Sequence, residues 1–385
     1  MPASLNVENA VRRRYSAAAQ NRVEALCCPI DYNREYLNVI PAEVLERDYG
    51  CGDPSRRLRA GETVLDLGSG AGKICFIAAQ VVGASGKVIG VDMNDDMLAL
   101  ARKHVKSVGD ALGFHNVEFR KGRIQDLGLD LEKLEAELRA HPIQSADSFL
   151  AAEARAEELR LTQPMIAGDS IDVVVSNCVL NLVDPRAKKH LFAEIFRVLR
   201  KGGRAVISDI VSDEPVPEML QNDAELWSGC ISGAMTEQDF LRAFLDAGFY
   251  GVRILHFDRE PWRTVQGIEF RSVTVEAFKG RQEPCLERLQ AVIYKGPFKE
   301  VVDDDNHRIQ RGERYAVCDK TYQLFKQEPY RDYFEFIDPR TEIPLDQAKP
   351  FDCSRTAPRH PKETKGENFN LTTPAGTCCD GGGCS

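Results

Sequence analysis

TVLDLGSGAGK, residues 63–73, is the stretch that decides the fold of this chain. Its apolar, β-branched beginning at Val64-Leu65 is typical of a buried parallel strand. Three glycines then turn the chain sharply into an apolar helical run over 74–82: Gly68, Gly70 and Gly72. Glycine lets the backbone approach a ligand closely, and the N–H groups that open the next helix are unpaired donors. The stretch therefore predicts a ligand-binding turn between a strand and a helix.

The segments around this turn indicate which ligand it binds. A dinucleotide fingerprint has G-x-G-x-x-G, whereas here the third glycine comes one residue earlier and follows Asp66, giving D-x-G-x-G-x-G. This order resembles motif I of the class I S-adenosylmethionine-dependent methyltransferases, in which the acid faces the methionine end of the cofactor. The run KVIGV at 87–91 predicts a second strand that ends at Asp92, about 20 residues past the glycines, where an acid can accept the ribose hydroxyls. The alternative is an ordinary tight turn, with Asp92 capping the following helix.

Strand-like and helical runs alternate along the next part of the chain, which predicts an α/β class with a Rossmann-like, doubly wound sheet. The expected strands and helices are strands 63–67, 87–91, 117–121, 171–176 and 204–210, and helices 73–82, 95–108 and 185–200. An antiparallel pair at 252–257 and 270–278 is expected to close the sheet. The segment 131–158 is charged and Ala-rich, and it predicts an inserted pair of surface helices.

Changes in this pattern divide the chain into four expected parts. Residues 1–60 form an N-terminal cap, and its helical beginning is expected to cover the sheet or the cofactor mouth. Residues 61–280 form the methyltransferase domain, with the insertion at about 131–168. Short strand-like runs with turn signals predict a small β-rich domain over 281–361. The polar tail 362–385 ends in TCCDGGGCS, and its glycine content predicts disorder.

The composition restricts the partners and the compartment. The chain has 50 basic and 59 acidic residues and a net charge of −9, which argues against a nucleic-acid partner. No apolar run approaches the ~18 residues of a membrane span, and the N-terminus lacks the apolar core of a signal peptide. We therefore expect a cytoplasmic protein without a membrane partner. Its twelve cysteines are then thiols, which favours soft-ion binding or thiol redox chemistry over a disulfide scaffold.

Several cysteines occupy distinctive places in the sequence. Cys51 lies between two glycines, which remove bulk around its sulfur, although a flexible linker with an incidental cysteine has the same pattern. Cys178 directly follows the fourth strand, where class I methyltransferases present groups to the transferring methyl; a buried structural cysteine is the alternative. Cys230 follows a glycine in a predicted loop. The adjacent pair Cys27 and Cys28 precedes a proline, which favours an extended surface segment.

Three short motifs make the resemblance more specific: YGCG at 49–52, SNCVLNL at 176–182 and GCISGA at 229–234. Together with the N-terminal Cys pair and the Cys-rich tail, they resemble the arsenite methyltransferases from about residue 24 to the end. The resemblance implies that Cys51, Cys178 and Cys230 bind trivalent arsenic and that Cys28 or Cys27 is their redox partner. It also implies S-adenosylmethionine contacts by Asp66, Gly68, Ser69, Gly70, Gly72, Asp92, Met93, Ile124, Gln125 and Asn177. The insertion and the position of the Cys pair depart from the family pattern.

The chemistry of arsenic suits three thiols. Trivalent arsenic is soft and three-coordinate, and its lone pair occupies the open side of the pyramid, so three thiolates can both hold and aim it. Arsenite or methylarsenite, including their glutathione conjugates, are the expected substrates. Methylation formally oxidises the arsenic, and a disulfide between Cys28 or Cys27 and Cys51 is a route for its reduction. Glutathione or thioredoxin would then restore the thiols.

Two other functions are compatible with parts of the sequence. The first is a methyltransferase that acts on a carbon or oxygen nucleophile of a small organic acceptor; it needs a general base, and the seven histidines do not cluster with any motif. The second is a non-catalytic thiol protein that sequesters zinc, copper or arsenic. It lacks a C-x-x-C pair for tetrahedral zinc and would leave the cofactor motif unused. The tail cysteines Cys378, Cys379 and Cys384 either capture arsenic or form an exposed, oxidisable end.

Overall fold

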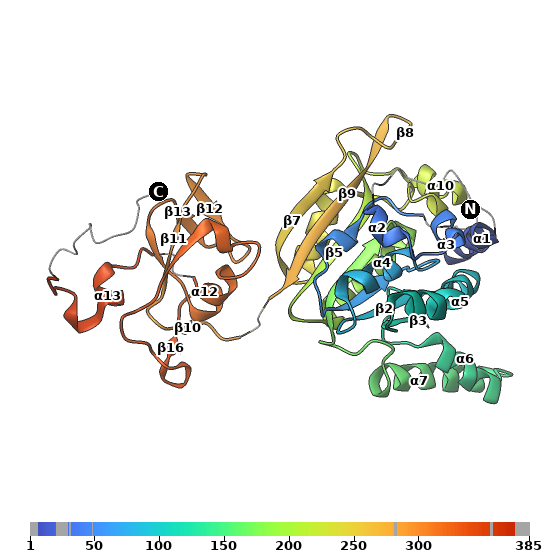
Figure 1. The fold of residues 1–385 in the computed structure, drawn as a ribbon, viewed down its shortest axis with the longest axis horizontal. Helices are drawn as coiled ribbons and strands as arrows, with labels where there is room; N and C mark the ends of the chain where they lie inside the picture. Colours follow the sequence, from blue (N-terminus) through green and yellow to red (C-terminus); the bar gives the residue numbers. More distant parts are fainter. Residues whose placement is uncertain are drawn as a thin grey trace. The chain divides into compact units, whose positions relative to one another are not determined.

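The chain divides after Gly280 into two compact units (Figure 1). The structure is a computed structural model, and it describes residues 7–20, 30, 32–47, 49–280, 283–354 and 357–373. The first unit contains the glycine turn and the large sheet. The second unit is smaller, and all its strands are short. Each unit has its own hydrophobic core.

The first unit is built on a nine-stranded sheet in the order β3-β2-β1-β4-β5-β9-β7, with β6 and β8 paired to β5 and β9. The strands from β3 to β5 are parallel, β9 runs antiparallel to β5, and β7 runs antiparallel to β9. This confirms the predicted doubly wound sheet with antiparallel closing strands. The strands are β1 (Thr63–Leu67), β2 (Lys87–Asp92), β3 (Val117–Lys121), β4 (Ile171–Asn177), β5 (Leu199–Ser212), β6 (Met235–Thr236), β7 (Phe249–Phe257), β8 (Arg263–Val265) and β9 (Ile268–Lys279).

The central strands β1 and β4 are apolar because helices cover both faces of the sheet. Val64, Leu65 and Leu67 are fully buried, and every position of β4 is buried. The strand order reverses between these two neighbours, and open α/β sheets bind ligands beyond the carboxyl ends of the strands at such a point. The topology therefore brings the glycine turn after β1 beside Asn177 and Cys178 at the end of β4.

Several helices of the first unit begin at residues whose side chains cap them. The Asn94 side chain accepts hydrogen bonds from the N–H groups of Asp96 and Met97 at the start of α5, and Gly113 ends that helix at φ +79°. The helices are α1 (Val7–Gln20), α2 (Arg34–Leu37), α3 (Ala42–Glu46), α4 (Lys73–Val82), α5 (Asp95–Leu112), α6 (Leu131–Ala140), α7 (Ala146–Thr162), α8 (Pro185–Val198), α9 (Glu218–Gln221), α10 (Ala224–Ser228) and α11 (Glu237–Asp246). The charged insertion is the α6–α7 pair.

Two local predictions in this unit were wrong. The segment after β5 was expected to be an irregular loop, but it contains α9 and α10; the Asp223 side chain caps α10 by accepting from Glu225 and Leu226. Helix α8 ends two residues before the predicted Arg200. Its C-cap Leu199 is already extended, because it pairs with Ile171 of β4.

The second unit is β-rich, as predicted, and has an aromatic core. Strand β11 lies between β14 and β15, and Phe325 stacks on Phe334 with ring centroids 4.5 Å apart. Helix α12 was not predicted, and α13 begins at Pro361 where the sequence predicted a disordered tail; His360 caps α13 in a capping box. The elements are β10 (Leu286–Glu287), β11 (Ala291–Tyr294), β12 (Glu300–Val302), β13 (Arg308–Gln310), β14 (Arg314–Ala316), α12 (Asp319–Phe325), β15 (Phe334–Ile337), β16 (Lys349–Pro350) and α13 (Pro361–Lys365).

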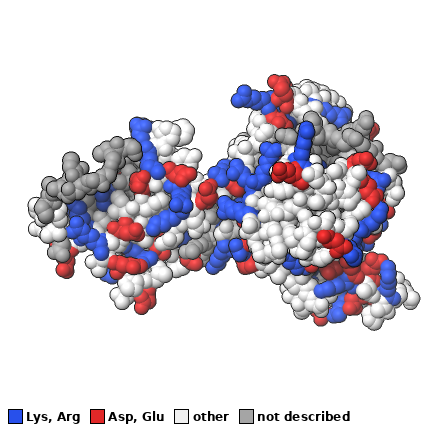
Figure 2. All heavy atoms as spheres, in the orientation of Figure 1, with Lys and Arg blue, Asp and Glu red and all other residues white. Residues whose placement is uncertain are grey.

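Charged side chains of both signs lie on the face of the molecule that Figure 2 shows. On this face, basic and acidic side chains are interspersed in both units. Within the described part of the chain, no helix is both long enough and apolar enough to cross a bilayer.

Candidate functional site

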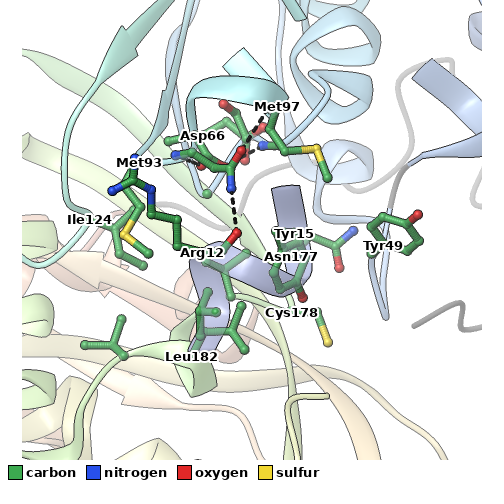
Figure 3. A pocket seen from close by; sticks show the side chains of 18 of the residues that line it. Arg12, Tyr15, Tyr49, Asp66, Met93, Met97, Ile124, Asn177, Cys178 and Leu182 are labelled. Atoms are coloured by element: carbon green, nitrogen blue, oxygen red, sulfur yellow. Dashed lines mark hydrogen bonds between the residues drawn. The ribbon is translucent and has the colours of Figure 1, made fainter. Parts of the chain in front are cut away.

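A pocket lies at the carboxyl ends of β1 and β4 and continues past β2 (Figure 3). Nearly all the residues that the sequence assigned to the cofactor line it. They are Asp66, Gly68, Ser69, Gly70, Asp92, Met93, Ile124, Gln125 and Asn177. The exception is Gly72, which lies at the start of α4, where an added Cβ would meet the Phe119 ring at 2.7 Å. Gly72 therefore serves packing between α4 and β3.

The glycine turn forms one wall of the pocket with its main chain. Gly68 has φ +69°, and an added Cβ would lie 2.3 Å from Cγ1 of Val179, in the segment after β4. Only glycine fits this approach between the two loops. The turn is fixed to β2 by the N–H of Gly70, which donates to Oδ2 of Asp92 at 2.9 Å.

Two polar side chains in the pocket are suited to hold a ligand. The Ser69 hydroxyl is buried and has no hydrogen-bond partner among the described residues, which is uncommon for a buried polar atom unless a ligand or water satisfies it. Asp92 accepts from the N–H groups of Gly70 and Asn94, and each oxygen retains capacity for a further donor. Burial raises the pKa of Asp92, and a hydroxyl-bearing ligand that donates to it would stabilise its carboxylate form.

Helix α1 covers the pocket, as expected for the N-terminal cap. Glu8, Val11, Arg12 and Tyr15 of this helix are among the lining residues. The Asn94 amide donates to the main-chain oxygen of Arg12 at 3.1 Å, as the dashed line in Figure 3 shows. The side chain of Gln125, one of the residues expected to contact the cofactor, donates to Glu8 at 3.2 Å. Helix α1 is therefore held over the pocket by contacts with the loops that line it.

The loop that contains Cys51 is held by Asn177. The Oδ1 atom of Asn177 accepts from the N–H groups of Cys51 and Gly52, at 2.9 and 3.0 Å, and its Nδ2 donates to the Gly52 carbonyl at 2.8 Å. Gly50 permits this approach, because a Cβ there would lie 2.2 Å from Nδ2 of Asn177. Asn177 thus uses its amide to position Cys51, although it also lines the pocket. The glycine beside the cysteine is required for this docking, a reason that the motif alone did not reveal.

Cys51, Cys178 and Cys230, which we call the methyltransferase triad, lie together although they come from three separate loops. Cys178 is the middle member, since its side chain has hydrogen-bond contacts with both Cys51 and Cys230. All three are buried, with exposed fractions of 5, 8 and 4%. Cys178 and Cys230 both have φ +64°, a left-handed conformation that is costly for a residue with a side chain and is concentrated at functional sites. Cys178 also lines the pocket, so it connects the thiols to the candidate cofactor site.

The surroundings keep Cys178 and Cys230 protonated. The contact with Cys178 and then burial raise the pKa of Cys230 well above its usual value. For Cys178, the contact with Cys230 lowers the pKa, but the contact with Cys51 and burial outweigh it, and the pKa is well above usual. The Tyr15 hydroxyl contacts Cys230, and burial raises the pKa of Tyr15 as well. These two cysteines therefore present neutral thiols to an incoming ligand.

Two buried charged side chains, Asp209 and Lys188, interact electrostatically behind the triad and were not identified from the sequence. Asp209, in the last part of β5, is fully buried, which raises its pKa to about 6. Its carboxylate accepts from the N–H groups of Leu180 and Ile210, both at 2.8 Å. Burial lowers the pKa of Lys188 to about 8, and its ammonium donates to the Gly233 carbonyl in the loop of Cys230. The position of Asp209 at a strand end was the available signal; nothing in the sequence indicated Lys188.

Some predicted residues cannot be placed. Cys27 and Cys28, and the tail cysteines Cys378, Cys379 and Cys384, lie outside the described residues. The redox role of Cys28 or Cys27 therefore stays a prediction.

Comparisons with known proteins agree with this geometry. Residues 58–248 match a family described as a methyltransferase domain, and residues 281–369 match a domain family of unknown function. The chain is 31% identical to the arsenite methyltransferase of Aquipseudomonas alcaligenes, with 86% of this chain and 91% of that protein covered. It is 28% identical to the arsenite methyltransferase of Mus musculus, with 87% and 86% covered. The crystal structure of an arsenic(III) S-adenosylmethionine methyltransferase from Chlamydomonas reinhardtii superimposes with a TM-score of 0.53 at 27% identity, covering 84% of this chain and all of that one.

Proposed function

The chain belongs to the arsenite methyltransferase family, and from this premise we propose that it transfers the methyl group of S-adenosylmethionine to thiol-bound trivalent arsenic. The product is a methylated arsenical, which makes the reaction a detoxification step. One observation carries the assignment of residues: Cys178 both lines the cofactor pocket and contacts the other two thiols of the methyltransferase triad.

The three thiols bind arsenite by replacing its hydroxyl groups, which leave as water. Each protonated thiol gives its proton to one hydroxyl of arsenite, so an As–S bond replaces each As–O bond and water leaves. No charge is created in the buried site, which suits thiols whose pKa is raised. Three sulfur ligands leave the lone pair of arsenic on the open side of its pyramid. Because Cys178 is the member that reaches the pocket, we place that open side toward the pocket.

The pocket residues hold and orient the cofactor. S-adenosylmethionine supplies an electrophilic methyl group on a sulfonium. Ser69 and Asp92 offer the unsatisfied hydroxyl and carboxylate lone pairs that polar groups of such a ligand require. Ile124 supplies a buried apolar surface for a ring, and α1 excludes water from the closed pocket. Asp66 faces the pocket and already accepts from the Cys75 thiol at 3.2 Å, so its orientation is fixed before the ligand binds.

A reductant completes the cycle. Methylation raises the formal oxidation state of arsenic by two, and two thiols can return these electrons by forming a disulfide. We propose Cys28 or Cys27 with Cys51 for this step, and glutathione or thioredoxin as the external thiol that restores them. Arsenite and methylarsenite, free or as glutathione conjugates, are the proposed substrates.

The first test is a reaction of the purified protein with arsenite, S-adenosylmethionine and either glutathione or thioredoxin, in which the arsenic species are separated and quantified over time. Methylated arsenic should form only when both the cofactor and a thiol are present. Omitting each component in turn is the control. If cofactor binding is measured by calorimetry but no methylated arsenic forms, the proposal fails, and a small organic acceptor becomes the better candidate.

A further inference from the structure

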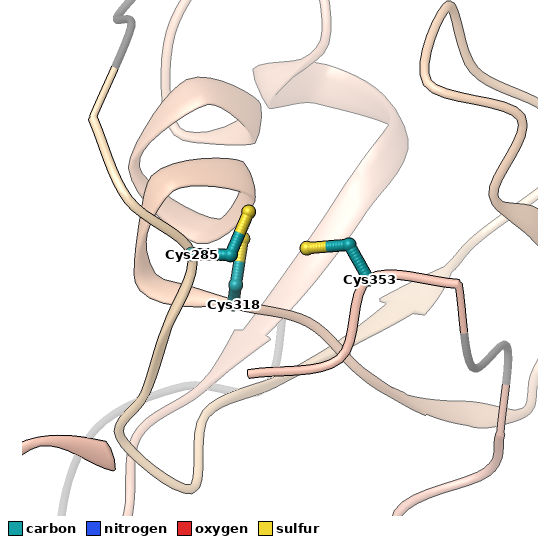
Figure 4. Close-up of side chains that lie close together, drawn as sticks. All are labelled: Cys285, Cys318 and Cys353. Atoms are coloured by element: carbon teal, nitrogen blue, oxygen red, sulfur yellow. The ribbon is translucent and has the colours of Figure 1, made fainter. Parts of the chain in front are cut away.

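Three cysteines of the second unit point their side chains into one space (Figure 4). The sulfurs of Cys285, Cys318 and Cys353 all lie within 4.8 Å of one another. No other group of three or more potential metal ligands meets this criterion among the residues that the structure describes. We call this group the C-terminal triad. Neither the cofactor motif nor the three cysteine motifs of the first unit includes any of its members.

The fold of the second unit brings these sulfurs together. Cys285 and Cys353 flank the paired strands β10 and β16, and the N–H of Phe351 donates to the Cys285 carbonyl at 2.8 Å. Cys318 caps α12, where its sulfur accepts from the N–H of Thr321 at 3.4 Å. Three segments that are far apart in sequence therefore deliver one thiol each. Such convergence is typical of a binding site and is not expected from an incidental cysteine.

The triad is both protected and accessible. Cys318 is buried with an exposed fraction of 1%, whereas Cys285 and Cys353 are half-buried. The ammonium of Lys320 lies close enough for electrostatic interaction with all three sulfurs and forms an ion pair with Asp305 at 3.8 Å. Burial raises the pKa of both Cys318 and Cys353.

We propose that the C-terminal triad is a second binding site for trivalent arsenic, separate from the site of methyl transfer. The existence of a three-thiol site follows from the geometry of the second unit, while the choice of arsenic among thiophilic ligands rests on the proposed function. Arsenite binds by the same water-releasing exchange: three As–O bonds break, three As–S bonds form, and three waters leave with the thiol protons. Arsenic stays trivalent, so the step requires no reductant.

The number and charge of the ligands favour arsenic over zinc. Structural zinc sites are almost always tetrahedral with four protein ligands, and among the described residues the triad offers three. Three thiolates with Zn²⁺ also leave one net negative charge, whereas three thiolates with trivalent arsenic are neutral. A trigonal-pyramidal ligand therefore satisfies the triad completely, and Zn²⁺ would need a fourth donor.

The test is the number of arsenite equivalents bound by the full chain, measured after gel filtration by elemental analysis. Cys27, Cys28, Cys378, Cys379 and Cys384 are replaced by serine in the parent protein so that other thiols do not contribute. We expect two equivalents in this parent, one after Cys178→Ser, one after Cys353→Ser, and none when both are changed. X-ray absorption of the Cys178→Ser protein should show three sulfur neighbours around arsenic. Ser354→Ala, in the same turn as Cys353, is the matched control and should keep two equivalents.

The possible results separate this proposal from the proposed function. If Cys353→Ser still binds two equivalents, the second site is refuted. The alternative result is that the parent copurifies with one equivalent of zinc that arsenite does not displace and that is absent after Cys353→Ser. That result would make the triad a zinc site. If Cys353→Ser does not fold, judged by circular dichroism, Cys285→Ala serves the same purpose. Two equivalents bound by a protein that methylates no arsenic would leave the second site standing and refute only the enzymatic assignment.

Discussion

The two triads of this chain contain the same three ligands in different arrangements. In the methyltransferase triad, Cys178 contacts a thiol on either side, its backbone is left-handed, and it opens onto a pocket. In the C-terminal triad, all three sulfurs lie within 4.8 Å of one another, and none of the three residues has a positive φ. A triad whose middle sulfur lines a pocket can present its ligand to a second reactant there, whereas three sulfurs that lie mutually close suit a ligand that is only held. We therefore expect turnover at the first triad and retention at the second.

The strongest test of this contrast is the loss of one thiol from each triad. Cys178→Ser should lower the rate of arsenite methylation more than about 100-fold, because it removes a direct ligand and not an outer-shell group, whose loss typically costs 10–100-fold. Binding of S-adenosylmethionine, measured by calorimetry, should change by less than about 3-fold. The comparison variant is Cys353→Ser. Equal loss of activity in both would contradict separate roles for the triads.

The buried carboxyl group of Asp209 offers a second test, since it interacts electrostatically with Cys178 and Cys230 of the methyltransferase triad. The pKa of Asp209 is raised to about 6, so between pH 3.8 and 6 the folded state holds a proton that the unfolded state has lost. The contribution of Asp209 to stability is therefore most favourable at low pH and is lost as the pH rises through this window. Relative to the wild type, Asp209→Asn should gain up to about 3 kcal/mol in the free energy of unfolding between pH 4 and 7.

Chemical denaturation at several pH values measures the difference in the free energy of unfolding between Asp209→Asn and the wild type. The change of this difference with pH is informative, because any pH-independent effect of the asparagine on stability cancels. Asp213→Asn is the control: Asp213 is exposed and lies just beyond the end of β5. A flat difference curve for Asp209→Asn would show that this carboxyl is not destabilised by burial.

The sequence predicted the sheet and the pocket well because both rest on local patterns. The strand that begins at Thr63, the glycine turn and Asp92 are each recognisable within a few residues, and the alternation of strands and helices predicts a doubly wound sheet. The C-terminal triad was missed because Cys285, Cys318 and Cys353 are more than 30 residues apart and belong to no short motif. Lys188 was missed for a similar reason. Only tertiary packing places its ammonium beneath the loop of Cys230.

Cys51 shows how a correct prediction can rest on an incomplete reason. Its flanking glycines predicted a functional cysteine, but Gly50 lets the loop dock on Asn177 and Gly52 lets it lie against Ser208. Gly50→Ala should therefore lower methylation about 10-fold and destabilise the fold by about 1–3 kcal/mol, the usual range for an overpacked site. Gly168→Ala is the matched control, because a Cβ there would make only an ordinary 3.6 Å contact.

Steady-state kinetics and thermal unfolding together check this prediction. If Gly50→Ala had full activity, the position of the Cys51 loop would not limit the reaction. The methyltransferase triad would then tolerate a displaced Cys51. If Gly168→Ala were equally impaired, the effect would not be specific to docking on Asn177.

The smallest expected effect is a change in binding affinity that depends on the net charge of the C-terminal triad with its ligand. Lys320 interacts electrostatically with all three sulfurs. Its charge stabilises a site with net negative charge but not a neutral one, so Lys320→Gln should leave the affinity for arsenite within about 2-fold. It should weaken any zinc binding by no more than about 5-fold, because a partly exposed charge contributes about 1 kcal/mol or less. Competition between the two ions in the parent with Cys178→Ser measures both affinities, and repeating it at high salt removes the electrostatic part. If the affinity for arsenite falls as much as the affinity for zinc, the arsenic-bound triad carries a net charge. The proposed neutral complex of arsenic with three thiolates, which distinguishes the triad from a zinc site, would then be wrong.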